Sequence, residues 1–239
     1  MKLLSKRHSV SLVVGALAVS AAIAAGSAIA SGEPTACETV SLAFLQTTVG
    51  LKHSTLLRDA NDLEGTGGEE PSELPQAFHS ECGIGLWSGK APKGQAATFE
   101  KARAGKAAQV GVDVWAPNDD SPNVGEWESK GFEELTAGFL KGRFQAVLKL
   151  PGIVKPLNPE GDGYSGAGIT VKATGPAHGL EAAAGCWWDV STHRAICLLT
   201  EEAEGKPVVN HLNTLAKKLV PSFLGAPWML AGAERPLGK

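Results

Sequence analysis

The chain has 239 residues, a formal net charge of −3 and 43% hydrophobic residues. This length suits one domain or two small ones, and the composition is that of a globular protein. The mild acidity argues against nucleic acid or an anionic membrane surface as a partner.

Residues 1–30 have the three parts of a secretory signal peptide. A basic start (Lys2, Lys6 and Arg7) precedes a long uncharged stretch, and Ala28-Ile-Ala30 offers the small residues that signal peptidase accepts. An uncleaved membrane anchor is the alternative, but the later half of the stretch is mostly Ala, Gly and Ser, which gain little in hydrocarbon. We therefore expect cleavage before Ser31, no stable membrane span afterwards, and a secreted or envelope-associated, extracytoplasmic protein.

The mature chain would have 209 residues, with 19 basic side chains against all 25 acidic ones. We expect a single domain over residues 31–225, followed by a C-terminal tail over 226–239. No internal repeat and no second hydrophobic span is present. We expect a monomer.

All four cysteines, Cys37, Cys82, Cys186 and Cys197, lie beyond the predicted cleavage site. An even number of cysteines in an exported chain indicates two disulfides. Three pairings are possible, and proximity favours Cys37–Cys82 with Cys186–Cys197. A zinc site would need closely spaced cysteine pairs, which the sequence lacks. We expect no metal and no cofactor.

The N-terminal half of the mature chain predicts one helix and two strands. Residues 41–50 form a short helix between a candidate N-cap, Ser41, and a terminating Gly50. Residues 58–75 are acidic and rich in Gly and Pro, which predicts a long loop. Residues 82–88 and 107–115 alternate between apolar and small or polar side chains, which predicts strands. A basic linker over 90–106 joins them.

Two helices and a short strand are expected further along. Residues 126–140 predict an amphipathic helix with a stripe of Phe132, Leu135, Phe139 and Leu140. A Gly/Pro-rich stretch over 151–168 leads to a strand at 169–173. Residues 208–220 have the strongest helical periodicity, and we expect Pro221 to end that helix.

Residues 186–197 predict a β-hairpin whose register is set by its cysteines. If Cys186 faces Cys197, then Asp189 faces Arg194, an opposite-charge pair that closes a four-residue loop. Counting three pairs back places the cysteines at a non-hydrogen-bonded position, where side chains approach most closely. Runs of strands with flanking helices indicate an α+β fold: an antiparallel sheet with flanking helices in a single, disulfide-stapled domain.

This layout resembles a family of small exported proteins and lipoproteins of unknown function from high-GC Gram-positive bacteria. Three features carry the resemblance: Cys37 before a helix that ends at Gly50, Cys82 before Trp87 in a strand, and a hairpin followed by the Leu215-Ala-Lys-Lys-Leu219 helix. It covers about half of the mature chain. Such lipoproteins carry Leu three residues before the lipidated Cys, whereas Cys37 follows Pro34-Thr-Ala36. The resemblance implies an envelope location, no catalytic residues, and here a soluble product.

Two kinds of functional residue can be proposed. Trp87, Trp115, Trp187 and Trp188 lie on predicted strands, where an exposed indole could serve as a platform for a flat ligand and a buried one would belong to the core. Trp187 and Trp188 must point to opposite faces. Ser165, with His178 or His193, could form a spatially assembled hydrolase site, although no nucleophile-elbow motif surrounds the serine.

No catalytic or metal-binding motif dominates this sequence. We therefore expect an exported, non-enzymatic envelope or extracellular protein that binds a partner protein or a small apolar ligand. The alternative is a secreted hydrolase with an assembled Ser/His site.

Overall fold

The computed structural model describes residues 36–62, 77–117, 152–189, 191–192 and 194–225. The predicted signal peptide, the C-terminal tail and the predicted helix over 126–140 lie outside these residues. Within them the chain forms one antiparallel sheet with three α-helices, which confirms the α+β class.

The sheet has seven strands in the spatial order β1-β2-β3-β7-β6-β5-β4, and each neighbouring pair is antiparallel. The strands are β1 (His53–Asp62), β2 (Ala77–Trp87), β3 (Ala107–Pro117), β4 (Gly152–Leu157), β5 (Ser165–Ala173), β6 (Leu180–Asp189) and β7 (Arg194–Ala203). The helices are α1 (Leu42–Val49), α2 (Gln95–Arg103) and α5 (Val208–Leu224), with a short 3-10 helix at Gly175–Ala177.

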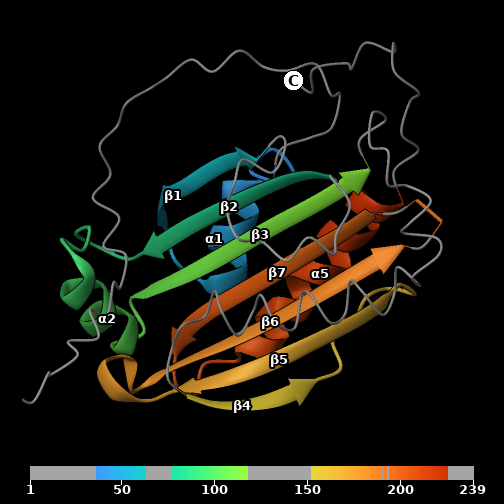
Figure 1. Ribbon diagram of the computed structural model, residues 1–239. Helices are drawn as coiled ribbons and strands as arrows, with labels where there is room; N and C mark the ends of the chain where they lie inside the picture. Colours follow the sequence, from blue (N-terminus) through green and yellow to red (C-terminus); the bar gives the residue numbers. More distant parts are fainter. Residues whose placement is uncertain (1–35, 63–76, 118–151, 190, 193, 226–239) are drawn as a thin grey trace, which may run out of the picture.

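Two helices cover one face of the sheet, here called the first face. Helix α5 packs on β6 and β7, and α1 packs beside α5 and near β1. Both helices lie behind the strands in Figure 1, so the opposite, second face is turned toward the viewer. Helix α2 lies at one end of the sheet, where Ala102 packs with Ala107 and Leu180.

The hairpin β6–β7 has the register that the cysteine spacing predicts. Cys186 is opposite Cys197, and Asp189 is opposite Arg194. The Cα atoms of the two cysteines are 4.0 Å apart, which is the close spacing of a non-hydrogen-bonded pair. The second disulfide joins Cys37, just before α1, to Cys82 on β2, so both predicted pairings are confirmed. Two disulfides are characteristic of proteins that fold in an oxidising, extracytoplasmic compartment.

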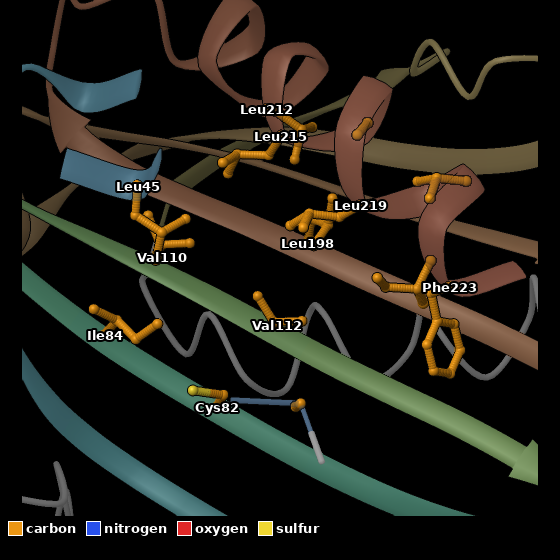
Figure 2. Close-up of a cluster of buried hydrophobic side chains, with 14 of the residues drawn as sticks. Leu45, Cys82, Ile84, Val110, Val112, Leu198, Leu212, Leu215, Leu219 and Phe223 are labelled. Atoms are coloured by element: carbon orange, nitrogen blue, oxygen red, sulfur yellow. The ribbon is translucent and has the colours of Figure 1, made fainter. Parts of the chain in front are cut away.

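The main hydrophobic core fills the space between the first face and its helices (Figure 2). Leu212, Leu215 and Leu219 recur along one side of α5 and meet Leu198 of β7 and Val112 of β3. These side chains are at most 2% exposed. Burying one such Leu or Val contributes about 1.5–3 kcal/mol, so this amphipathic stripe holds α5 against the sheet.

The prediction that Pro221 ends the last helix is wrong. Helix α5 continues through Pro221 to Leu224, and the amide of Gly225 donates to the carbonyl of Pro221. A proline inside a helix removes one backbone hydrogen bond. Phe223 and Leu224 are 3% and 1% exposed, so the added turn buries two large side chains that offset this cost.

Three other elements, and the start of a fourth, fall where no regular structure is expected. Strand β1 extends to Asp62, into the acidic stretch predicted as a loop, and α2 occupies the basic linker. Strand β4 and the first residues of β5 lie in the Gly/Pro-rich stretch over 151–168. In each case pairing or packing with distant parts of the chain outweighs a weak local pattern.

The two disulfides close loops of different length, which predicts different contributions to stability. The sequence separations are 45 for Cys37–Cys82 and 11 for Cys186–Cys197. On the chain-entropy model, replacing the first pair by alanine lowers the free energy of unfolding by about 4 kcal/mol, and replacing the second lowers it by about 3 kcal/mol. Urea unfolding of both double variants measures the two losses. A larger loss for the shorter loop would contradict this account.

Candidate functional site

The second face carries its own apolar cluster on β5, β6 and β7. Strand alternation places small side chains at its centre, with the Cys186–Cys197 disulfide among them. All members are at most 5% exposed. They are Ile169, Val171, Ala182, Ala184, Cys186, Trp188, Ala195 and Cys197. Both faces of the sheet are therefore apolar in this region, as expected for a sheet covered on both sides.

The four tryptophans of the predicted platform are divided between the two faces. Trp188 lies on the second face and is paired with Ala195 of β7, which is paired on its other side with Trp115 of β3. Trp87 is half-buried at the α2 end of that face, where its ring stacks on His53 with centroids 6.2 Å apart. Trp187 points to the first face and is fully buried. The two neighbouring tryptophans thus have opposite orientations, as the sequence predicts.

Trp187 belongs to the main core, and three glycines approach its indole closely. A Cβ atom at Gly161 would lie 2.1 Å from Cδ1 of Trp187, and one at Gly166 would lie 2.7 Å from the same atom. A Cβ at Gly185 would lie 2.8 Å from Cη2. Gly161 and Gly166 make room at one edge of the indole and Gly185 at the opposite edge, so Trp187 of β6 packs closely against the segment that joins β4 to β5.

This close packing predicts a specific overpacking defect. Gly161→Ala forces the indole of Trp187 or the loop to move and lowers the free energy of unfolding by about 1–3 kcal/mol. Adding Trp187→Phe, which shortens the ring system, should recover part of that loss. Chemical unfolding of the two single variants and the double variant measures the coupling. Strictly additive losses would show that Gly161 and Trp187 are energetically independent.

Glu201 is a half-buried carboxyl group near the α2 end of the second face. Its partners in the flanking strands are Gln109 and Ala182, neither of which carries charge. Burial raises the pKa of Glu201 above its ordinary value of 4.5. The folded protein therefore holds this proton more tightly than the unfolded chain does.

This shift predicts how Glu201 affects stability. The protonated carboxyl group of Glu201 favours the folded state fully below pH 4.5, the ordinary pKa that the group has in the unfolded chain. This stabilisation is lost as the pH rises through the higher pKa of the folded state. Glu201→Gln should therefore raise the free energy of unfolding at pH 7 and have little effect at pH 4. Glu204→Gln is the matched control, because Lys172 lowers the pKa of the exposed Glu204. A gain for Glu201→Gln that is larger at pH 4 than at pH 7 would contradict the assignment.

Polar contacts on the first face hold the start of α5 on β7. The Thr200 hydroxyl donates to the carbonyl of Val208, at 3.0 Å. The Glu202 carboxylate lies 2.6 Å from Nδ1 of His211, with side chains 5% and 18% exposed. Because this pair joins a strand to a helix and is largely shielded from water, we assign it a structural role.

The serine and histidine of the alternative hydrolase site are not brought together. Ser165 begins β5, opposite Trp188, whereas His178 follows the other end of the same strand. Ser165 and Ala173 are the first and last of the 9 residues of β5, about 26 Å apart along an extended chain. His193 lies outside the described residues. Within the described part of the chain, no group of three or more His, Cys, Asp or Glu residues is placed to hold a metal ion.

The sheet has two edges of different character. Strand β1 contains a register shift between Leu56 and Arg58, the kind of irregularity that discourages further strand pairing. Strand β4 pairs with β5 without interruption and is exposed on both sides. Ile153 and Val154 are 57% and 43% exposed. The β4 edge thus presents two β-branched apolar side chains in a row.

The non-hydrogen-bonded Cys186–Cys197 pair determines which backbone groups of β4 point away from the sheet. Because Cys186 forms a non-hydrogen-bonded pair with Cys197, its N–H and C=O point to Ala167 on β5. Because hydrogen-bonded positions alternate along β5, the N–H and C=O of the next residue, Gly168, point to its partner on β4, Leu157. The same alternation directs the backbone of Ile153 and Lys155 inward.

The backbone groups of Gly152, Val154 and Pro156 therefore point away from the sheet. Proline, which has no N–H to donate, is found on edge strands at such outward positions, so Pro156 agrees independently with this assignment. The sequence reasoning missed this edge because it assigned residues 151–168 to a Gly/Pro-rich stretch. The adjacent β-branched residues Ile153 and Val154 were the signal that could have revealed it.

Comparisons with known proteins give one distant likeness. No protein-family model and no curated protein sequence matches this chain. Among solved structures, the extracellular domain of PknH from Mycobacterium tuberculosis aligns with a TM-score of 0.43 and 8% identity, over 77% of this chain and 91% of that one. A likeness at this level bears on neither the ancestry nor the function of this chain. Among the described residues, no helix is long and apolar enough to cross a membrane.

Proposed function

We propose that this protein is an exported, non-enzymatic domain of the cell envelope or extracellular space that binds an extended segment of a partner protein along β4. The observation that carries the proposal is the open, uninterrupted edge with Ile153 and Val154 exposed. An added strand gains main-chain hydrogen bonds from the edge and specificity from alternate side chains.

The edge defines the chemistry of the partner. Gly152 and Val154 each offer an outward N–H and C=O, and Pro156 offers only its C=O, so the contact ends there. Ile153 and Lys155 point to one side of the sheet and Val154 to the other. The fitting segment is therefore short and extended, with an apolar residue beside Val154 and an acidic residue within reach of Lys155.

The test uses a displayed library of random nonapeptides selected on the mature chain, residues 31–239. Val154→Pro removes an outward N–H and leaves the pairing with β5 intact, so it should weaken selected peptides at least about tenfold and change stability little. Leu42→Ala, which removes an exposed side chain elsewhere, is the matched control and should bind normally. Lys155→Pro removes an inward N–H and should instead destabilise the fold.

Amide hydrogen exchange identifies the surface that is used. In the free protein the amides of Gly152 and Val154 should exchange quickly, and those of Ile153 and Lys155 slowly. Bound peptide should slow the first two. The proposal would be contradicted if bound peptide slowed amide exchange only in β1 or on the second face, or if Val154→Pro bound the selected peptides as tightly as the unchanged protein does.

A further inference from the structure

One end of the sheet carries a row of cations, one for each of five adjacent strands. These strands have the order β1-β2-β3-β7-β6, and the ends in question lie beside α2, at the left in Figure 1. Neighbouring strands are about 4.8 Å apart, so the row extends over about 19 Å. All five residues are exposed. This cationic row consists of Lys52 before β1, Lys90 after β2, Lys106 before β3, Lys206 after β7 and Arg103 of α2 beside the start of β6.

Contacts with the backbone position several members of the row. The Ser88 amide donates to the carbonyl of Lys106, which holds Lys106 beside the end of β2. A Cβ at Gly105 would lie 3.1 Å from Cε of Lys206, so the Lys206 side chain reaches the residue before Lys106. Arg103 is anchored to the turn that precedes β6. The row is therefore continuous from β2 to β6.

The guanidinium group of Arg103 is oriented with one edge available. Its Nη1 donates to the carbonyls of Pro176 and His178, at 3.1 and 3.3 Å. Within the described residues, its Nε and Nη2 have no hydrogen-bond partner. These two groups form the planar fork that binds a carboxylate or phosphate through two parallel hydrogen bonds. An anion can therefore bind there without displacing a contact that the described residues make.

The positive charge of the row is not balanced locally. Residues 88–106, which join β2 to β3, contain five basic residues and one acidic residue, Glu100, although the whole chain has a net charge of −3. In the described part of the structure, no carboxylate forms an ion pair with a member of the row. Neighbouring cations repel one another, so a bound anion would relieve a repulsion that the free protein carries.

An aromatic pair lies at the β1–β2 end of the row. His53 directly follows Lys52 and is exposed. Its ring stacks on Trp87, with centroids 6.2 Å apart and an angle of 28° between the ring planes. The C–H face of a sugar ring carries partial positive charge and packs on the negative face of an aromatic ring. The row and the pair together offer contacts to anionic groups and to a sugar ring.

These features favour one class of partner. A row of cations about 19 Å long matches a linear polymer with repeated negative charges better than a single small anion. Proteins that bind an anionic membrane insert large apolar side chains beside their cations. In the described chain the exposed ones, Leu42, Leu56, Ile153 and Val154, all lie outside residues 88–106. Two disulfides indicate an extracytoplasmic compartment, where polysaccharides rather than nucleic acids are the abundant polyanions.

We propose that the cationic row and the His53–Trp87 pair bind a linear anionic polysaccharide of the cell envelope. Arg103 and the lysines contact its anionic groups, and His53 contacts a sugar ring at one end of the row. The inference goes beyond the proposed function and does not depend on it, because strand addition uses the outer edge of β4 and this surface is an end of the sheet.

Titration calorimetry with an oligogalacturonate tests the class of ligand on the mature chain, residues 31–239. The acidic oligosaccharide should bind at low salt, and an uncharged malto-oligosaccharide of equal length should not. High salt should weaken the binding at least about tenfold, because exposed charges are screened. Equal binding of the neutral sugar, no binding of the acidic one, or binding only to phosphatidylglycerol vesicles or to an oligonucleotide would overturn the proposal.

A pair of substitutions tests the row itself. Lys90→Gln with Lys106→Gln should weaken the oligogalacturonate at least about fivefold without lowering the urea midpoint, because removing two cations reduces repulsion in the free protein. The matched control, Lys217→Gln with Lys218→Gln, removes the same charge from exposed positions of α5 and should bind as the unchanged protein does. Equal losses of affinity for the two pairs would show that net charge alone matters, against the proposal.

Substitutions of His53 separate a sugar contact from attraction between charges. His53→Ala removes the exposed ring and keeps the row, so it should weaken the oligogalacturonate about threefold and leave the salt dependence unchanged. His53→Phe keeps a ring without a charge and should restore the affinity. If His53→Ala binds as tightly as the unchanged protein, or if His53→Phe binds no better than His53→Ala, the assignment to a polysaccharide is wrong.

Discussion

The pairing of Cys186 with Cys197 is the constraint on which the arrangement of the sheet depends. Because the two cysteines form a non-hydrogen-bonded pair, the direction of every backbone N–H and C=O in β6 and β7 is determined. The alternation of hydrogen-bonded and non-hydrogen-bonded pairs then determines these directions in the neighbouring antiparallel strands as well. A shift of one residue would exchange the two faces of β7 and move Leu198 out of the main core. It would also exchange the inward and outward residues of β4. The hairpin thus governs both the core and the exposed edge.

The two faces of the sheet bury different kinds of side chain. The first face meets long side chains from α5, and its polar groups, Thr200 and Glu202, find partners on that helix. The second face has small side chains. In the described part of the structure, each face buries one indole nitrogen without a hydrogen-bond partner, that of Trp187 on the first face and that of Trp188 on the second. Such an unpaired donor costs about 1–3 kcal/mol.

Sequence reasoning succeeded where local spacing determines structure. The hairpin register follows from two cysteines and a turn. Helix α1 lies between Ser41 and Gly50 as expected, and Gly50 has the left-handed conformation that ends a helix, but the Ser41 side chain makes no capping hydrogen bond. It failed where distant contacts decide. Helix α5 passes Pro221 because Phe223 and Leu224 find space in the core, and no local pattern reports that space. Strand β4 has Gly and Pro among its six residues and exists only because β5 pairs with it. The candidate edge was missed with it, and whether the tryptophans bind a ligand stays a prediction.

The two disulfides lie on opposite faces of the sheet, but along the chain they join neighbouring cysteines, the first to the second and the third to the fourth. For a chain that leaves the cytoplasm N-terminus first, the native partner of Cys37 is the next thiol to emerge, and the native partner of Cys186 is likewise the next. An oxidase that joins thiols in order of appearance would therefore form only native bonds. Sequential oxidation of this kind would reach the native pairing without a step that isomerises mispaired disulfides.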